Sequence, residues 1–70
     1  MSDTLAFKVF CIEEYKNARN ISGQDAATLF IEYSVLEYLT KHYDALHSQG
    51  PDYLIDDISQ FIFNRQTEKE

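Results

Sequence analysis

Seventy residues with twelve acidic and six basic side chains make a small chain with a net charge of −6. This length fits one domain, because chains divide into separate cores only when they are several times longer. The negative charge repels phosphate backbones, and the Lys and Arg residues are scattered, so we expect no direct contact with nucleic acid. A hydrophobic content of 44 % is too high for a disordered chain.

The N-terminal residues and the single cysteine point to the cytoplasm. Met-Ser-Asp-Thr lacks the basic start and long apolar stretch of a secretion signal, and no run approaches the ~20 apolar residues of a membrane span. Cys11 is the only cysteine, which excludes an internal disulfide and the ligand spacing of a structural zinc site. We expect Cys11 to be a small buried residue in a reducing compartment, rather than a nucleophile.

The first predicted helix runs from about Asp3 to Arg19, and Asn20 suits the left-handed residue that often ends a helix. Its first three turns are apolar around nearly the whole circumference, which is typical of a helix buried on more than one side. Ser22 is a natural N-cap for the second helix, with Asp25 at the N3 position.

Ser34 and Glu37 have the spacing of a capping box, which predicts that a third helix begins there and continues to His47. One continuous helix from Ser22 to His47 is the alternative, since serine is tolerated inside helices. The last helix opens at Pro51, because proline fits the first helical position.

These patterns predict an all-α protein, a compact bundle of about four short helices. We expect a single domain over residues 1–70, with an ordered core over about residues 3–65 and a frayed C-terminus at residues 66–70.

The polar residues do not form a pattern that indicates catalysis. His42 and His47 are five residues apart, so they do not share a helical face as an i,i+4 ligand pair would. His47 instead lies in the last turn of its helix, where an imidazole can hydrogen-bond to free carbonyl oxygens. Adjacent carboxylates such as Asp56 and Asp57 point about 100° apart, which prevents shared proton chemistry. We expect no enzymatic activity, no cofactor and no metal site.

The chain has more apolar side chains than a four-helix core needs if each helix contributes one apolar stripe to it. Those that lie off the stripes or at their margins form our predicted protein interface: Phe7, Phe10, Ile31, Tyr38, Tyr53 and Phe63. The alternative is that steeply crossing helices bury wide stripes in so small a domain. Aromatic anchors ringed by acidic residues would suit a partner whose surface is basic.

Several short stretches resemble a family of very short bacterial proteins known only as a domain of unknown function. They are residues 10–17, 21–23, 29–30, 35–36 and 46–50, and the resemblance spans roughly residues 5 to 62. The most specific stretch reads Leu-His-x-Gln-Gly, and we expect its role to be structural. It is formed by Leu46, His47, Gln49 and Gly50.

Members of that family look like neighbours of small ADP-ribosyltransferase-like proteins, in an arrangement similar to toxin–antitoxin pairs. The resemblance implies that this chain is the antitoxin-like or accessory partner of such an enzyme. Many antitoxins also carry a DNA-binding segment, and this sequence shows none.

Three hypotheses for the function follow from the sequence. The first is a non-enzymatic protein-binding module, with the neighbour-encoded enzyme as its suspected partner. The second is a self-associating small helical structural protein, in which the apolar first helix packs against a second copy. The third is a metal or small-ligand site built from Cys11, His42, His47 and nearby carboxylates, and a chelator would test its metal version.

Overall fold

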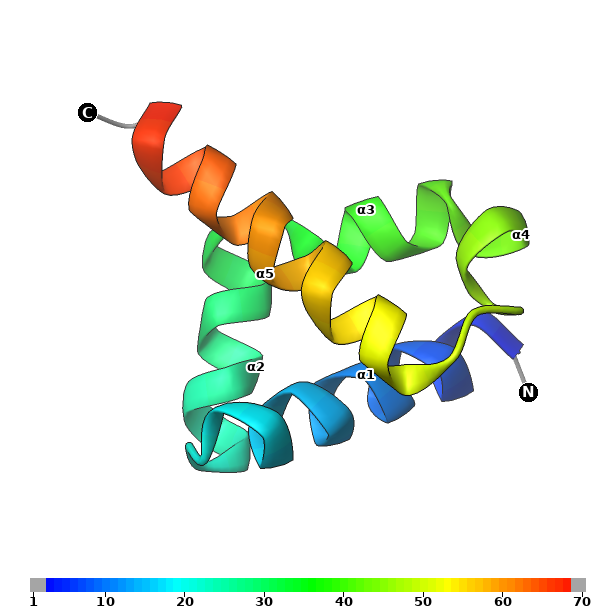
Figure 1. Ribbon diagram of the computed structural model, residues 1–70, viewed down its shortest axis with the longest axis horizontal. Coiled ribbons are helices and arrows are strands. Elements are labelled where there is room, and N and C mark those ends of the chain that lie inside the picture. The colour runs from blue at the N-terminus through cyan, green and yellow to red at the C-terminus, as the bar shows by residue number, and fades with distance from the viewer. Residues whose placement is uncertain (1–2, 69–70) are drawn as a thin grey trace.

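The computed structural model describes residues 3–68, and within them the chain forms five α-helices and no β-strand. In chain order they are α1 (Asp3–Arg19), α2 (Gly23–Glu32), α3 (Val35–Lys41), α4 (Tyr43–Leu46) and α5 (Pro51–Glu68). In Figure 1, α2 rises steeply from the end of α1, α3 and α4 run back above α1, and α5 crosses diagonally in front. The predicted compact all-α bundle is confirmed, with one more helix than expected. None of these helices is long and apolar enough to cross a membrane.

The junction between α1 and α2 follows the sequence prediction closely. Asn20 has a positive φ of 56°, the left-handed conformation expected of the residue that ends α1. The Ser22 hydroxyl oxygen accepts a hydrogen bond from the Asp25 backbone N–H at 3.0 Å, so Ser22 is the N-cap of α2.

A break between α2 and α3 is confirmed, but the predicted capping box is wrong. Ser34 has φ 60° and ψ 32°, a left-handed conformation, and its side chain makes no capping hydrogen bond. Its backbone N–H instead donates to the carbonyl oxygen of Ile31 at 3.3 Å, which closes the last turn of α2. Ser34 is therefore a residue that ends α2, and this backbone conformation takes its hydroxyl away from the first turn of α3.

The predicted third helix is divided at His42, a second difference from the sequence expectation. His42 has φ −109° and ψ 22°, which separates the last residue of α3 from the single turn of α4. The ring of Tyr43 then packs edge-on against Phe7, with ring centroids 5.4 Å apart, and Leu46 is buried. The bend thus turns α4 toward the core instead of letting the helix continue past it.

The last helix begins at Pro51, as predicted, and runs to Glu68. The Leu54 backbone N–H donates to the carbonyl oxygen of Gly50 at 3.1 Å, so α5 is hydrogen-bonded from its first turn. The helix continues through Gln66 to Glu68, and the expected fraying of the C-terminus stays a prediction. Residues 69–70 lie outside the described part of the chain.

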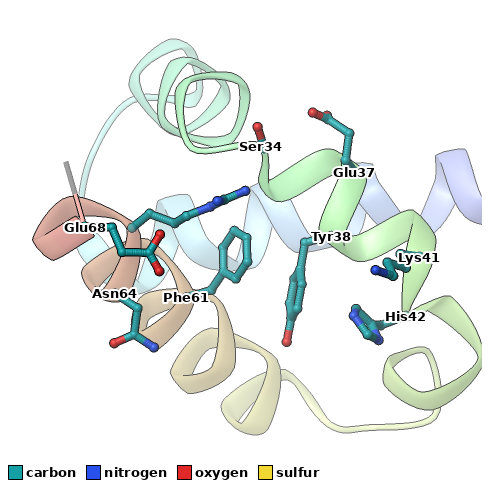
Figure 2. Close-up of a pocket in the computed structure, with 9 residues that line it drawn as sticks. Ser34, Glu37, Tyr38, Lys41, His42, Phe61, Asn64 and Glu68 are labelled. Atoms are coloured by element: carbon teal, nitrogen blue, oxygen red, sulfur yellow. The ribbon is translucent and has the colours of Figure 1, made fainter.

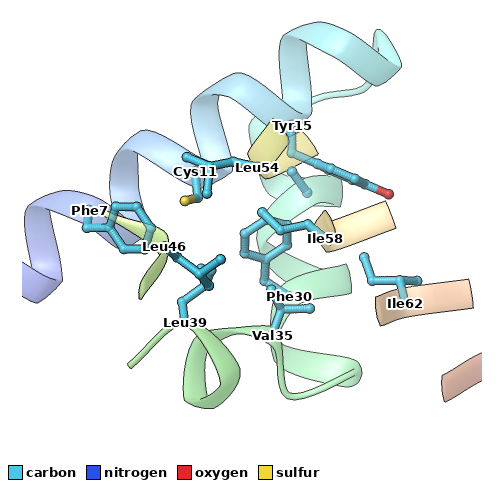
Figure 3. Packing of buried hydrophobic residues seen from close by; sticks show 11 residues of the cluster. Phe7, Cys11, Tyr15, Phe30, Val35, Leu39, Leu46, Leu54, Ile58 and Ile62 are labelled. Carbon is cyan, nitrogen blue, oxygen red and sulfur yellow. The ribbon is translucent and has the colours of Figure 1, made fainter. Parts of the chain in front are cut away.

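One hydrophobic core holds the helices together, and Phe30 lies at its centre (Figure 3). The Phe30 ring is 0 % exposed and packs edge-on against Tyr15, with ring centroids 5.5 Å apart. Every helix contributes to this core, which consists of Phe7, Cys11, Tyr15, Ala26, Phe30, Val35, Leu39, Leu46, Leu54, Ile58 and Ile62.

Candidate protein-binding surfaces

The N-terminal half of α1 exposes large apolar side chains on the side away from the core. Its inward side supplies Phe7 and Cys11, while Leu5 is 53 %, Val9 52 % and Phe10 41 % exposed. Residues three and four apart on a helix are surface neighbours, so these side chains join through the exposed Ala6 into one surface. We call this surface the α1 outer face; it is formed by Leu5, Ala6, Val9 and Phe10.

The six residues predicted to form an interface lie in three different environments. Phe7 is only 8 % exposed, because α4 places Tyr43 against it, so its expected exposure is wrong. Tyr38 is half-buried between α3 and α5. The other four are exposed and come from α1, α2 and α5; they are Phe10, Ile31, Tyr53 and Phe63. Whether any of them contacts a partner stays a prediction.

Leu5 and Val9 were absent from the predicted interface although both are more exposed than Phe10. The signal that could have found them is the all-round apolar pattern of α1. Since a helix in a small domain has neighbours on one side, the apolar residues on the opposite side stay open.

A groove of about 480 Å³ lies between α3 and α5 (Figure 2). Its floor is a pair of stacked rings, Tyr38 and Phe61, with centroids 4.2 Å apart and planes 22° apart. The His42 ring lies beside this pair, with its centroid 4.9 Å from that of Tyr38 and its plane tilted by 54°. The Arg65 guanidinium carbon lies 5.1 Å from the Phe61 centroid. The Tyr38 hydroxyl also donates a hydrogen bond to the Asp57 carboxylate at 2.7 Å.

Both basic side chains (Lys41, His42 and Arg65) and acidic side chains (Glu37 and Glu68) line this groove. Burial, together with the hydrogen bond to Asp57 and the charge of that carboxylate, raises the pKa of Tyr38 to about 12. Within residues 3–68 a single ion pair has its charged atoms closer than 4.0 Å, that of Lys16 with Glu13 at 3.6 Å. Lys41 and Arg65, which line the groove, therefore have no carboxylate within 4.0 Å among these residues.

A smaller groove of about 340 Å³ lies beside the exposed ring of Phe63. Half-buried Ile21 and Leu29 line it, together with Arg19, whose guanidinium carbon lies 5.8 Å from the centroid of the Tyr15 ring. This mixture of an aromatic ring, aliphatic side chains and an arginine is common in protein interfaces.

Cys11 lies in the hydrophobic core, and the imidazole of His47 contacts a backbone carbonyl oxygen. Burial, with a smaller contribution from the charge of Glu14, raises the pKa of Cys11 to about 12, so its thiol stays protonated and is a poor nucleophile. His47 Nδ1 lies 2.7 Å from the Tyr43 carbonyl oxygen, which also accepts a hydrogen bond from the His47 backbone N–H and so is not the free carbonyl that was expected. Within residues 3–68 we find no group of three His, Cys, Asp or Glu side chains that could hold a metal ion.

The Leu-His-x-Gln-Gly stretch connects α4 to α5. Leu46 is buried in the core, and the ring of His47 stacks on Tyr43 with centroids 4.5 Å apart. The Gln49 side-chain amide lies 3.5 Å from the Ala45 carbonyl oxygen, a long hydrogen bond back to α4. The Gly50 carbonyl oxygen also accepts a hydrogen bond in the first turn of α5. That the role of the stretch is structural stays a prediction.

Comparison with known proteins gives one match. The family described as "Protein of unknown function (DUF3791)" matches residues 6–65. This range includes all of α2, α3 and α4 and most of α1 and α5. No curated protein and no solved structure matches the chain. Because the family model covers most of the sequence, the chain belongs to the DUF3791 family, whose function is unknown.

Proposed function

We propose that this protein is a non-enzymatic binding module that recognises another protein through the α1 outer face. The observation that carries the proposal is the contiguous exposure of Leu5, Val9 and Phe10, each at least two-fifths open to solvent. Covering half of a large aliphatic side chain contributes about 1 kcal/mol, so this face offers a few kcal/mol to a complementary apolar surface. An exposed apolar cluster of this kind on a small domain is typical of an interaction site.

The overall charge narrows the kind of partner. A chain with a net charge of −6 associates fastest with a protein whose surface is basic, because opposite charges steer the encounter. The family resemblance supplies the first candidate, an ADP-ribosyltransferase-like enzyme encoded beside this chain in a bacterium. In that case the protein acts in the cytoplasm as the antitoxin-like or accessory subunit.

Co-expression with the product of the adjacent gene tests this proposal, with size-exclusion chromatography and light scattering as the measurement. We expect a stable heteromeric complex that Val9→Lys abolishes, because a charge at the centre of the α1 outer face cannot be buried without a partner. Asn17→Lys is the matched control, since it adds the same charge at an exposed polar position of α1 and leaves the complex intact.

Two outcomes would contradict the proposal. A complex that tolerates Val9→Lys would remove the α1 outer face from the interface. A homodimer that ignores the neighbouring protein and dissociates with Val9→Lys would instead establish self-association through that face.

A further inference from the structure

The groove between α3 and α5 is lined by as many Lys and Arg as Glu side chains, in a chain that is acidic overall. Lys41, His42 and Arg65 all line it. Within residues 3–68 neither Lys41 nor Arg65 has a carboxylate within 4.0 Å, although the chain carries twice as many acidic as basic residues. Two unpaired cations beside an open groove are complementary to a ligand that brings its own carboxylates.

The aromatic floor of the groove adds to this preference. In Figure 2 the ring of Tyr38 lies between Phe61 and His42. The Arg65 guanidinium carbon is 5.1 Å from the Phe61 centroid. The edge of an aromatic ring carries partial positive charge, so a negative group that meets a ring edge in this groove is attracted to it.

The groove follows the whole length of α3, from Ser34 to His42. The seven residues of α3 span about 10 Å. This is the length of about three residues of extended chain.

We propose that this groove binds a short acidic peptide segment of a protein partner, with carboxylates that pair with Arg65 and Lys41. This groove shares no residue with the α1 outer face. The proposal therefore goes beyond the proposed function, because it adds a second binding surface and states the chemistry of the ligand that binds there.

Two carboxylates of the chain itself also line the groove, and they make the charge argument testable. The Glu37 carboxylate points away from the stacked rings in Figure 2, whereas Glu68 lies near Phe61. An acidic peptide is repelled by Glu68, so Glu68→Gln should strengthen binding. A role for Glu68 in folding alone would not predict that gain.

Titration of the isotopically labelled protein with peptides, followed by NMR, tests the proposal. The probe is acetylated, amidated Glu-Ala-Glu, and the control peptide is Gln-Ala-Gln. We expect the acidic peptide to shift amide signals of residues 34–42 and 61–68, and the neutral peptide to leave them unchanged. Arg65→Gln and Lys41→Gln should each weaken binding about fivefold, the effect of one exposed ion pair. Arg19→Gln removes a cation outside the groove and should leave binding unchanged.

Three results would overturn the proposal. The first is equal binding of the neutral peptide, and the second is a set of shifted signals outside the two groove segments. The third is binding of inorganic phosphate at the same residues with equal affinity, which would make the groove a general anion site. Since these experiments use the protein alone, they do not depend on whether the neighbour-encoded enzyme binds the α1 outer face.

Discussion

Tyr38 is a single side chain that joins two helices. Its ring stacks on Phe61 and its hydroxyl donates to Asp57, so one residue of α3 makes both an apolar and a polar contact with α5. Burial and these contacts with Asp57 raise its pKa from 10.0 to about 12, which means that the folded state holds the hydroxyl proton more tightly than the unfolded state does.

We expect Tyr38→Phe to lower the free energy of unfolding by about 1 kcal/mol near neutral pH, because the hydrogen bond to Asp57 is lost. The contribution of the Tyr38 proton is complete below pH 10 and is lost as the pH rises toward 12. Urea denaturation across that range should therefore show a steeper loss of stability in the wild type than in Tyr38→Phe. Tyr53→Phe, at an exposed position of α5, should keep most of the wild-type loss, because the charge of Tyr53 is the smallest of the causes that raise the pKa of Tyr38.

Cys11 should resist thiol reagents as long as the protein is folded. Its side chain is almost fully buried, so a reagent cannot reach the sulfur. Its pKa is raised to about 12, so the reactive thiolate does not form near neutral pH. Labelling with a chromogenic disulfide should be slow in buffer and fast in denaturant. Rapid labelling of the folded protein would show that α1 opens locally around this residue.

At the scale of the helices, two serines that look alike in the sequence have opposite roles. Ser22 hydrogen-bonds the first turn of α2, whereas Ser34 adopts a left-handed conformation and makes no capping hydrogen bond. Left-handed backbone costs an L-residue roughly 1 kcal/mol and costs glycine little. The two positions should therefore respond differently to loss of the side chain.

We expect Ser22→Ala to lower the stability by about 1 kcal/mol, the usual effect of removing an N-cap. Ser34→Gly should raise the stability by up to about 1 kcal/mol, because glycine accepts the left-handed conformation. Thermal unfolding followed by circular dichroism measures both changes. Destabilisation by Ser34→Gly would mean that the Ser34 hydroxyl stabilises α3 after all.

The helix boundaries that the sequence could predict are those set by local chemistry. Asn20, Ser22 and Pro51 each carry a conformational or hydrogen-bonding preference that operates within one turn, and the structure agrees at all three. The break at His42 depends instead on the distant contact of Tyr43 with Phe7, which has no local signal.

The same distinction applies to the predicted interface. Apolar periodicity indicates that α1 has more apolar surface than one core contact can use, and the structure agrees. It does not indicate which side chains stay open, because that depends on where α4 and α5 cross α1. For this reason the sequence pattern predicts exposure of Phe7, which is buried, and does not single out Leu5, which is exposed.

At the scale of the whole molecule, a domain of 70 residues has little stability to lose. A core of this size supplies roughly 3–5 kcal/mol. Truncating a buried phenylalanine costs about the same amount, because it removes transfer free energy and leaves a cavity.

We therefore expect Phe30→Ala to unfold the protein at room temperature, since Phe30 is 0 % exposed at the centre of the core. Phe63→Ala is the matched control, because this ring is 61 % exposed and its loss should change the stability by less than about 0.5 kcal/mol. Far-ultraviolet circular dichroism distinguishes the two outcomes. A helical, cooperatively melting Phe30→Ala variant would mean that the core is more tolerant than its burial indicates.

The packing of α5 across α1 has a consequence for the folding reaction. Leu54 and Ile58 complete a core whose other side comes from residues some forty positions earlier, such as Cys11 and Tyr15. Contacts so distant along the chain form late, since the intervening loop must close first. Until α5 docks, the apolar surface of α1 and α3 that it covers stays open, and during this interval chaperones and proteases can bind that surface.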